Sequence, residues 1–282
     1  MTDRPILTED ELRRLCEYLY RRTGMIFTEA KRYYVERRLW ERMAATGSVS
    51  FTDYFAHLRT DMHDEIQQFV NAFTVNETYF YREDYQLRCL TNDLVQERVS
   101  DKQVGESIRI WSAACSTGEE PYSIAMWLLE NWPRVDDYFI EIVGSDIDTR
   151  ALDSARAGTF GNRALMRLSP ELIGKYFAEL PDERWQIVSQ LRDSVSFSFV
   201  NLMEPGDTRQ HGRFDVIFCR NVLIYFDDAS RRLAAENLYE NLLPGGFICL
   251  GHTESMSRIS PLFEARRFAD AIVYQRPAGA RS

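Results

Sequence analysis

Two neighbouring glutamates, Glu119 and Glu120, lie in a turn between a strand-like run at 108–113 and a helical pattern. The turn, residues 114–123 (ACSTGEEPYS), contains one glycine, Gly118. A strand, a tight turn and a helix in this order form the nucleotide crevice of a Rossmann-like sheet. Dinucleotide-binding turns use several glycines because the backbone must approach a pyrophosphate closely. Carboxylates in the turn would repel the negative charge of that pyrophosphate. The acids therefore favour a ligand with a cationic end and no phosphate, such as S-adenosylmethionine.

A second acidic position follows the next strand-like run. Asp146 ends that run, and Asp148 directly precedes a helical pattern. An acid at this strand end accepts hydrogen bonds from ribose hydroxyls in both the dinucleotide and the methyltransferase versions of the fold. The alternative role, capping the helix, suits Asp148 better. We therefore assign ribose binding to Asp146.

The elements before residue 76 are predicted to be helical. Leu12, Leu15 and Leu19 form a stripe at helical spacing, and Thr8 with Glu11 has the spacing of a capping box. Strand-like alternation is absent from this part of the sequence. Residues 1–75 are therefore expected to form a small all-helical domain, which a linker at 76–106 joins to a larger domain at 107–282.

The larger domain alternates strand and helix patterns, which predicts a mostly parallel sheet. Its expected strands are 108–113, 139–145, 195–200, 214–219, 247–251 and 271–276. Its expected helices include 121–130, 148–157 and 229–242. Residues 174–194 interrupt the alternation, since Tyr176-Phe177 and 185–188 resemble short strands around a turn at 181–183.

Composition excludes several classes of protein. The net charge of −9 disfavours general binding to nucleic acid. The five cysteines are scattered and never form a Cys-x-x-Cys pair, so neither a disulfide framework nor a metal site is expected, and a reducing cytosol fits. The acidic N-terminus does not resemble a signal peptide. The longest apolar run found, 124–129, is too short for a membrane span, so we expect a cytoplasmic protein without membrane insertion.

Several blocks, in order along the chain, resemble the chemotaxis receptor methyltransferases, the CheR family. They are 76–83 (NETYFYRE), 114–123, 144–148 (GSDID), 214–227 (FDVIFCRNVLIYFD), 245–247 (GGF) and 251–254 (GHTE). The resemblance implies an α/β fold, with a Rossmann-like class I methyltransferase sheet, the helical N-terminal domain and a small antiparallel β-subdomain at 174–194. It also implies an enzyme that methylates glutamate side chains of chemoreceptors, with S-adenosylmethionine as donor and S-adenosylhomocysteine as product.

The resemblance assigns roles to particular residues. Arg82 and Tyr225 are expected to position the substrate carboxylate. The expected cofactor-binding residues are Asn76, Thr78, Arg82, Glu119, Asp146, Asn201, Leu202, Arg220 and Asn221. Glu119 is preferred to Glu120 because it lies nearer the turn. Asn201 and Leu202 are expected to flank the adenine.

The helical domain is the expected docking surface for receptors. Residues 13–42 contain nine Lys or Arg and four Glu. A predicted helix carries one stripe of basic residues, formed by Lys31, Arg38 and Arg42. The stripe is compatible with a solvated surface, but we expect it to bind an acidic helical partner. Some family members capture a receptor tail peptide with a glycine-bearing turn in the β-subdomain. This chain has no glycine in the turn, which argues against such capture.

Two other functions were weighed. A non-catalytic interaction module would keep the fold and use the basic helices to bind a partner. A nicotinamide-dependent oxidoreductase would need a glycine-rich turn in place of the acids at 119 and 120. The methyltransferase is preferred to both.

Overall fold

The computed structural model describes residues 6–60 and 64–279. The chain forms two compact units. The first combines the residues up to Val75 with Tyr225–Ser230, and the second combines Asn76–Ile224 with the residues from Arg231 onward.

The first unit is helical, as the sequence predicts. Its helices are α1 (Glu9–Thr23), α2 (Arg32–Thr46), α3 (Phe51–Thr60) and α4 (Asp64–Phe73), with a 3-10 turn at Glu29–Lys31. The predicted capping box is confirmed, because the Thr8 side chain accepts from the Glu11 N–H and the Glu11 side chain accepts from the Thr8 N–H. The predicted stripe of Leu12, Leu15 and Leu19 is buried.

The short segment Tyr225–Ser230 packs with these helices, although it is distant in sequence. The Ile26 N–H donates to the Tyr225 carbonyl at 2.9 Å, and Met25 forms an antiparallel bridge with Phe226. The Tyr20 hydroxyl donates to the Asp227 carboxylate at 3.1 Å. The first unit is therefore built from two separate stretches of chain, which the sequence analysis did not anticipate.

The second unit is built on a seven-stranded sheet in the order β6-β2-β1-β7-β8-β10-β9. These strands are β1 (Ser107–Ala113), β2 (Phe139–Asp146), β6 (Val195–Phe199), β7 (Phe214–Cys219), β8 (Leu242–Leu250), β9 (Glu264–Arg267) and β10 (Ile272–Gln275). The first five are parallel to one another, and β10 pairs antiparallel with both β8 and β9. All six predicted strands are present, and β9 is an additional one.

Helices precede β1 and connect the strands that follow it. They are α5 (Asp84–Cys89), α6 (Val95–Val99), α7 (Glu119–Asn131), α8 (Thr149–Ala157), α9 (Asn162–Leu165), α10 (Pro170–Tyr176), α11 (Ser189–Arg192), α12 (Pro205–Arg209) and α13 (Asp228–Glu240). A π-helical turn, Leu90–Leu94, links α5 to α6. The last helix is shorter than the predicted 229–242, because β8 already begins at Leu242 beside Phe214.

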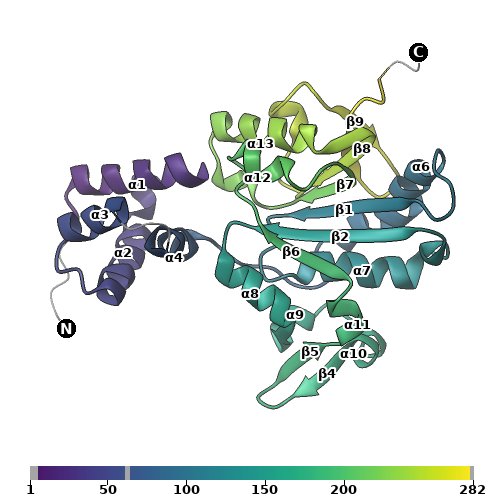
Figure 1. Ribbon diagram of the computed structural model, residues 1–282, viewed down its shortest axis with the longest axis horizontal. Helices are drawn as coiled ribbons and strands as arrows, with labels where there is room; N and C mark the ends of the chain where they lie inside the picture. The colour runs from purple at the N-terminus through teal and green to yellow at the C-terminus, as the bar shows by residue number, and fades with distance from the viewer. Residues whose placement is uncertain (1–5, 61–63, 280–282) are drawn as a thin grey trace. The chain divides into compact units, whose positions relative to one another are not determined.

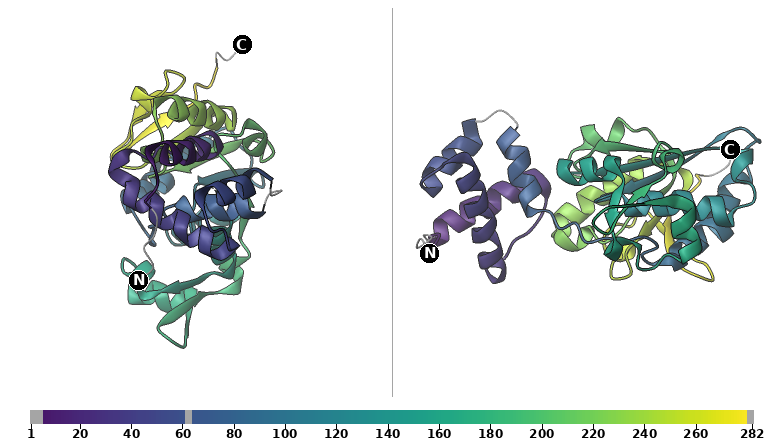
Figure 2. Two further views of the ribbon diagram at one scale, coloured as in Figure 1. Left: turned by 90° about the vertical axis from the view of Figure 1, so that its left-hand side faces the viewer. Right: turned by 90° about the horizontal axis from the view of Figure 1, so that it is seen from below.

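A second, three-stranded antiparallel sheet confirms the predicted β-subdomain. Its order is β3-β5-β4, formed by β3 (Thr159–Gly161), β4 (Phe177–Leu180) and β5 (Arg184–Ile187). The β4–β5 hairpin projects away from the main sheet (Figures 1 and 2). Its turn has Asp182 and Glu183 in left-handed backbone conformations, with φ of 62° and 55°.

The parallel order places five strand ends at one edge. From β1 the chain crosses to β2 and β6 on one side, and then to β7 and β8 on the other. Such a reversal opens a crevice outside the carboxyl ends of the strands. Figure 1 shows β6, β2, β1 and β7 side by side. Most of the predicted site residues lie at or just after these strand ends, whereas Asn76, Thr78 and Arg82 lie on the linker before β1.

Gly118 forms the tightest part of the turn after β1. Its φ is +95°, and a Cβ here would lie 2.8 Å from the Ala155 Cβ in α8. Only glycine meets both demands without strain.

We expect Gly118→Ala to lower the free energy of unfolding by about 1–2 kcal/mol or more, because alanine adds left-handed strain and overlap. Chemical denaturation measures the loss. Gly174→Ala is the matched control, since Gly174 lies in α10 with nothing within 4 Å of an added Cβ. Equal stability of the two variants would contradict this account of the turn.

Candidate functional site

The buried carboxylate of Asp146 lies at the carboxyl end of β2. One oxygen accepts from the Ser116 N–H at 2.8 Å and the other from the Asp148 N–H at 2.9 Å. Burial is the larger influence and raises the pKa of Asp146 to about 6, although these backbone hydrogen bonds oppose it. The group is thus held in place as an acceptor that is ionised at neutral pH and easily protonated below it.

Asn76 connects the linker to two residues beside Asp146. Its Oδ1 accepts from the Ser116 hydroxyl at 3.0 Å, and its Nδ2 donates to Asp148 at 2.8 Å. The other Asp148 oxygen accepts from the N–H groups of Arg150 and Ala151, which confirms that Asp148 caps α8. The start of the linker is therefore attached to the turns after both β1 and β2.

Glu119 and Glu120 have different environments, although they are neighbours at the start of α7. Glu119 is buried and accepts from the Thr117 hydroxyl at 2.6 Å. Glu120 accepts from the Ser112 hydroxyl at 2.7 Å and pairs with Arg220 at 3.1 Å. Burial raises the pKa of both carboxyls, and in Glu120 the Arg220 guanidinium opposes the rise. Glu120 is thus committed to an internal ion pair, whereas Glu119 is not.

Arg220 follows β7, and its side chain is only 3% exposed. Besides Glu120, its guanidinium contacts the Glu83 carboxylate at 3.5 Å and donates to the Arg82 carbonyl at 2.5 Å. Its Nε is buried without a hydrogen-bond partner among the described residues. The geometry makes Arg220 the bridge between α7 and the linker.

Arg82 lies on the linker itself. Its Nη1 donates to the Glu77 carbonyl at 2.8 Å, and its guanidinium lies 5.9 Å from the centre of the Tyr79 ring. The sequence left open that Arg82 only pairs with Glu83 or Asp84. Instead Glu83 contacts Arg220, and Asp84 pairs with Arg88 at 2.7 Å. Thr78, in the same segment, is half-buried.

Asn221 has a left-handed backbone conformation, with φ of 58°. One oxygen of Glu254, from the turn after β8, accepts from the N–H groups of both Asn221 and Gly251 at 2.8 Å. The other Glu254 oxygen is buried and has no hydrogen-bond partner among the described residues. The sequence predicts no role for Glu254, and its place in the block 251–254 is the only signal that points to it.

Asn201 and Leu202 form the turn after β6, and both are buried. The Asn201 side-chain oxygen accepts from the Met203 N–H at 3.0 Å, and its own N–H donates to Asp207 at 3.0 Å. The Leu202 carbonyl accepts from Asn237 at 2.8 Å. These bonds fix the turn at the same sheet edge as Asp146.

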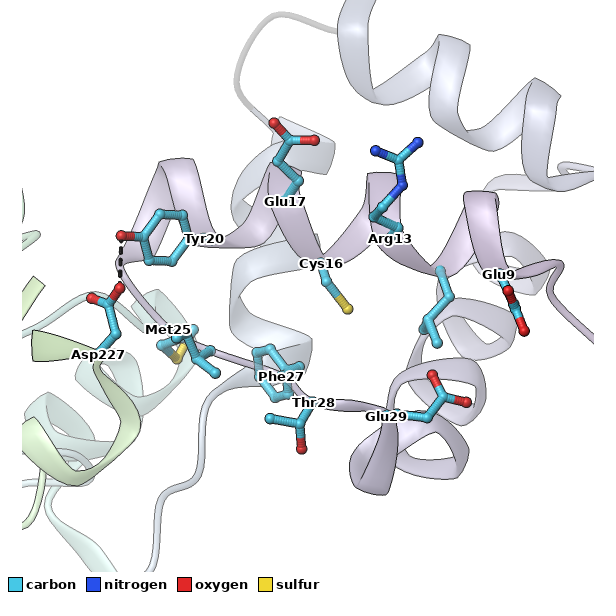
Figure 3. Close-up of a pocket in the computed structure, with 12 residues that line it drawn as sticks. Glu9, Arg13, Cys16, Glu17, Tyr20, Met25, Phe27, Thr28, Glu29 and Asp227 are labelled. Carbon is cyan, nitrogen blue, oxygen red and sulfur yellow. Dashed lines mark hydrogen bonds between the residues drawn. The ribbon is translucent and has the colours of Figure 1, made fainter. Parts of the chain in front are cut away.

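Tyr225 belongs to the first unit, where it is 36% exposed. That unit also contains an open pocket between α1 and the segment that follows it (Figure 3). The carboxylates that line this pocket include Glu17, which pairs with Arg21, and Glu29, which pairs with Arg32. Two of the pocket's carboxylates thus already have an arginine partner.

The residues at the carboxyl edge suit the cofactor predicted from the sequence. Asp146 offers acceptors for two hydroxyls, and Glu119 offers a carboxylate beside the turn for an ammonium group. A diphosphate would be repelled by these acids, and the turn has only one glycine to let the backbone approach it. The site therefore fits a cationic nucleoside without phosphate.

A sheet of this order, with five parallel strands, an antiparallel pair at one end and acids at the carboxyl edge, is typical of a Rossmann-like methyltransferase domain. Comparison with protein families gives the same class. Residues 76–271 match the family described as "CheR methyltransferase, SAM binding domain", and residues 10–74 match "CheR methyltransferase, all-alpha domain". The chain belongs to the CheR methyltransferase family, and its cofactor is S-adenosylmethionine.

Curated relatives extend over nearly the whole chain. "Chemotaxis protein methyltransferase 2" of Vibrio cholerae is 45% identical and covers 98% of this chain and 96% of its own length. "Chemotaxis protein methyltransferase" of Salmonella typhimurium is 36% identical, with coverages of 94% and 91%. "Chemotaxis protein methyltransferase 2" of Pseudomonas aeruginosa is 38% identical, with 90% of each chain covered.

Within residues 6–60 and 64–279, no helix combines the length and the apolar character needed to cross a bilayer. In the same part of the chain, no group of three or more His, Cys, Asp or Glu side chains is arranged to hold a metal ion.

The raised pKa of Asp146 predicts how cofactor affinity depends on pH. Because its ionised form accepts hydroxyl donors, affinity should be full above about pH 6 and fall by up to about tenfold per unit below it. Calorimetry with S-adenosylhomocysteine measures this, since the ligand's own groups titrate outside that range. Asp146→Asn should bind weakly with a flatter pH profile; an unchanged profile would show that another group titrates.

The two glutamates should respond differently to neutralisation. Glu119→Gln should weaken S-adenosylhomocysteine binding about tenfold while leaving thermal stability nearly unchanged, because its carboxylate has no cationic partner among the described contacts. Glu120→Gln should mainly lower stability, because Arg220 loses a buried counter-ion. The reverse pattern in calorimetry and thermal melting would exchange the two roles.

Proposed function

We propose that this protein transfers the methyl group of S-adenosylmethionine to glutamate side chains of chemoreceptors. The products are glutamyl methyl esters and S-adenosylhomocysteine. The observation that supports this most is the acidic carboxyl edge, with Asp146 buried after β2 and Glu119 after β1, in a chain that matches the family over both units. The chemotaxis methyltransferases named above support a role in a chemosensory pathway.

The chemistry asks the protein for placement rather than for a strong base. The cofactor supplies an electrophilic methyl group on a sulfonium; a carboxylate oxygen forms the new C–O bond, and the C–S electron pair remains on sulfur. A glutamate is already ionised at pH 7, so no proton must be removed. The residues of the chain must hold the carboxylate in line and exclude water.

In this proposal Arg82 holds the substrate carboxylate and Tyr225 orients it by one hydrogen bond. Asn76, Thr78, Glu119 and Asp146 hold the cofactor from the linker and the first two strand ends. The cofactor is also held from the ends of β6 and β7, by Asn201, Leu202, Arg220 and Asn221. The Arg82 contact cannot be very tight, because the carboxylate loses its charge as the ester forms.

The first unit is the proposed receptor-docking domain. On and beside α2, Lys31 and Arg37 are exposed and Tyr33 is 74% exposed, which offers a basic and aromatic face to an acidic helix. Three arginines pair with glutamates inside the unit: Arg32 with Glu29, Arg37 with Glu41 and Arg42 with Glu65. Only Glu65 reduces the positive excess of residues 13–42 further, because Glu29 and Glu41 are already counted within that segment. We place the reaction in the cytoplasm, where the helical portions of chemoreceptors lie.

The deciding experiment is transfer of labelled methyl from S-adenosylmethionine to purified receptor cytoplasmic fragments, with base-labile release of methanol as proof of a glutamyl ester. Absence of incorporation with every fragment, while S-adenosylhomocysteine still binds, would favour a non-catalytic interaction module. Tight binding of NADH instead would favour an oxidoreductase.

Arg82→Ala should lower methyl transfer by about hundredfold and weaken S-adenosylhomocysteine binding by less than about threefold, because the guanidinium is assigned mainly to the substrate. Steady-state kinetics and calorimetry measure the two effects. Equal tenfold losses in both would contradict this division.

A further inference from the structure

Arg82 lies between two residues with unusual backbone conformations. Tyr81 and Glu83 both have left-handed conformations, with φ of 58° and 55°. Neither is glycine or asparagine, so each costs about 1–2 kcal/mol relative to an ordinary conformation. Such strain persists only where surrounding contacts enforce it, and it concentrates at functional sites.

Contacts from α7 hold the residue before Arg82. The Tyr81 N–H donates to the Ser123 hydroxyl at 3.0 Å. The Tyr81 ring packs edge-on against Trp127, with ring centres 5.1 Å apart. One side of Arg82 is therefore fixed to the helix that begins with Glu119 and Glu120.

The residue after Arg82 is held by its carboxylate. One oxygen of Glu83 contacts His252 Nδ1 at 2.9 Å, and the other accepts from the Tyr85 hydroxyl and the Gln86 amide at 3.1 Å each. Arg220 approaches the second oxygen at 3.5 Å. The Glu83 side chain is only 11% exposed.

These contacts come from three elements. Arg220 follows β7, His252 follows β8, and Tyr85 and Gln86 lie in α5. Burial favours the neutral acid, but the Arg220 guanidinium and the hydrogen bonds from His252 and Tyr85 outweigh it and lower the pKa of Glu83. The carboxylate therefore stays ionised and acts as a fixed charge.

We propose that Glu83 is a positioning residue for the methyl-transfer reaction: its carboxylate anchors the linker to the ends of β7 and β8 and so holds Arg82 in its working orientation. The proposal rests on the function proposed above. Arg220 acts on the same segment, since it donates to the Arg82 carbonyl. Glu83 does not itself contact the reacting atoms.

Neutralising this carboxylate isolates its effect. Glu83→Gln keeps the size of the side chain and one acceptor oxygen but removes the charge that faces Arg220. The control is Asp84→Asn, the neighbouring acid, which lies in an exposed pair with Arg88. Exposed ion pairs of this kind contribute little to the free energy of folding.

The first readout is amide hydrogen exchange of the full-length protein without cofactor. We expect exchange across residues 76–85 to become about tenfold faster in Glu83→Gln, with the protection of β1 unchanged. Asp84→Asn should behave as the unaltered protein. Unchanged exchange in Glu83→Gln would overturn the anchoring role.

The second readout is a double-mutant cycle with Arg82. Glu83→Gln alone should lower kcat of methyl transfer about tenfold, and should lower it by less than about twofold when added to Arg82→Ala, because its effect passes through Arg82. An equal loss on both backgrounds would overturn the positioning role and indicate a general structural one.

The two readouts separate this inference from the proposed function. If the unaltered protein methylates no receptor fragment while Glu83→Gln accelerates exchange at 76–85, the anchor exists but the proposed function fails, and the positioning role fails with it. If the unaltered protein is active and Glu83→Gln matches Asp84→Asn in both readouts, the function stands and the role of Glu83 is rejected.

Discussion

The structure of the catalytic unit depends on one buried cation. The guanidinium of Arg220 contacts carboxylates from two segments, Glu83 on the linker and Glu120 on α7, and also the Arg82 carbonyl. A buried arginine in an apolar sheet would be costly without such partners, and removing one partner leaves the remaining charge uncompensated. The segments are therefore interdependent: the linker, α7 and the end of β7 hold one another in place.

The linker meets the sheet edge at two separate points. Near its start, Asn76 links the turns after β1 and β2 through Ser116 and Asp148. Near Arg82, the contacts come instead from α7 and from the turns after β7 and β8. A segment attached at both ends can carry side chains for the cofactor and for the substrate with little loss of entropy on binding.

Much of this arrangement follows from sequence pattern alone. Alternating strand and helix segments predict the parallel sheet, and a parallel sheet gathers its strand ends at one edge, so Glu119, Asp146 and Arg220 had to lie near one another. The sequence pattern could not decide which of the adjacent acids Glu119 and Glu120 pairs with a cation. Only the packing of the structure shows that Glu120 pairs with Arg220. The role of Glu254 and the left-handed backbone around Arg82 depend on contacts between residues far apart in sequence, which no local signal encodes.

The first unit is built from two separate stretches of chain, which limits how the enzyme can be cut into fragments. A fragment that ends at Val75 would lack the bridge partner of Met25 and the acceptor for the Tyr20 hydroxyl, since both come from Tyr225–Ser230. A chimera that exchanges the helical domain between relatives must therefore carry those six residues as well. Such an exchange would consequently replace Tyr225 as well, because that residue belongs to the same compact unit.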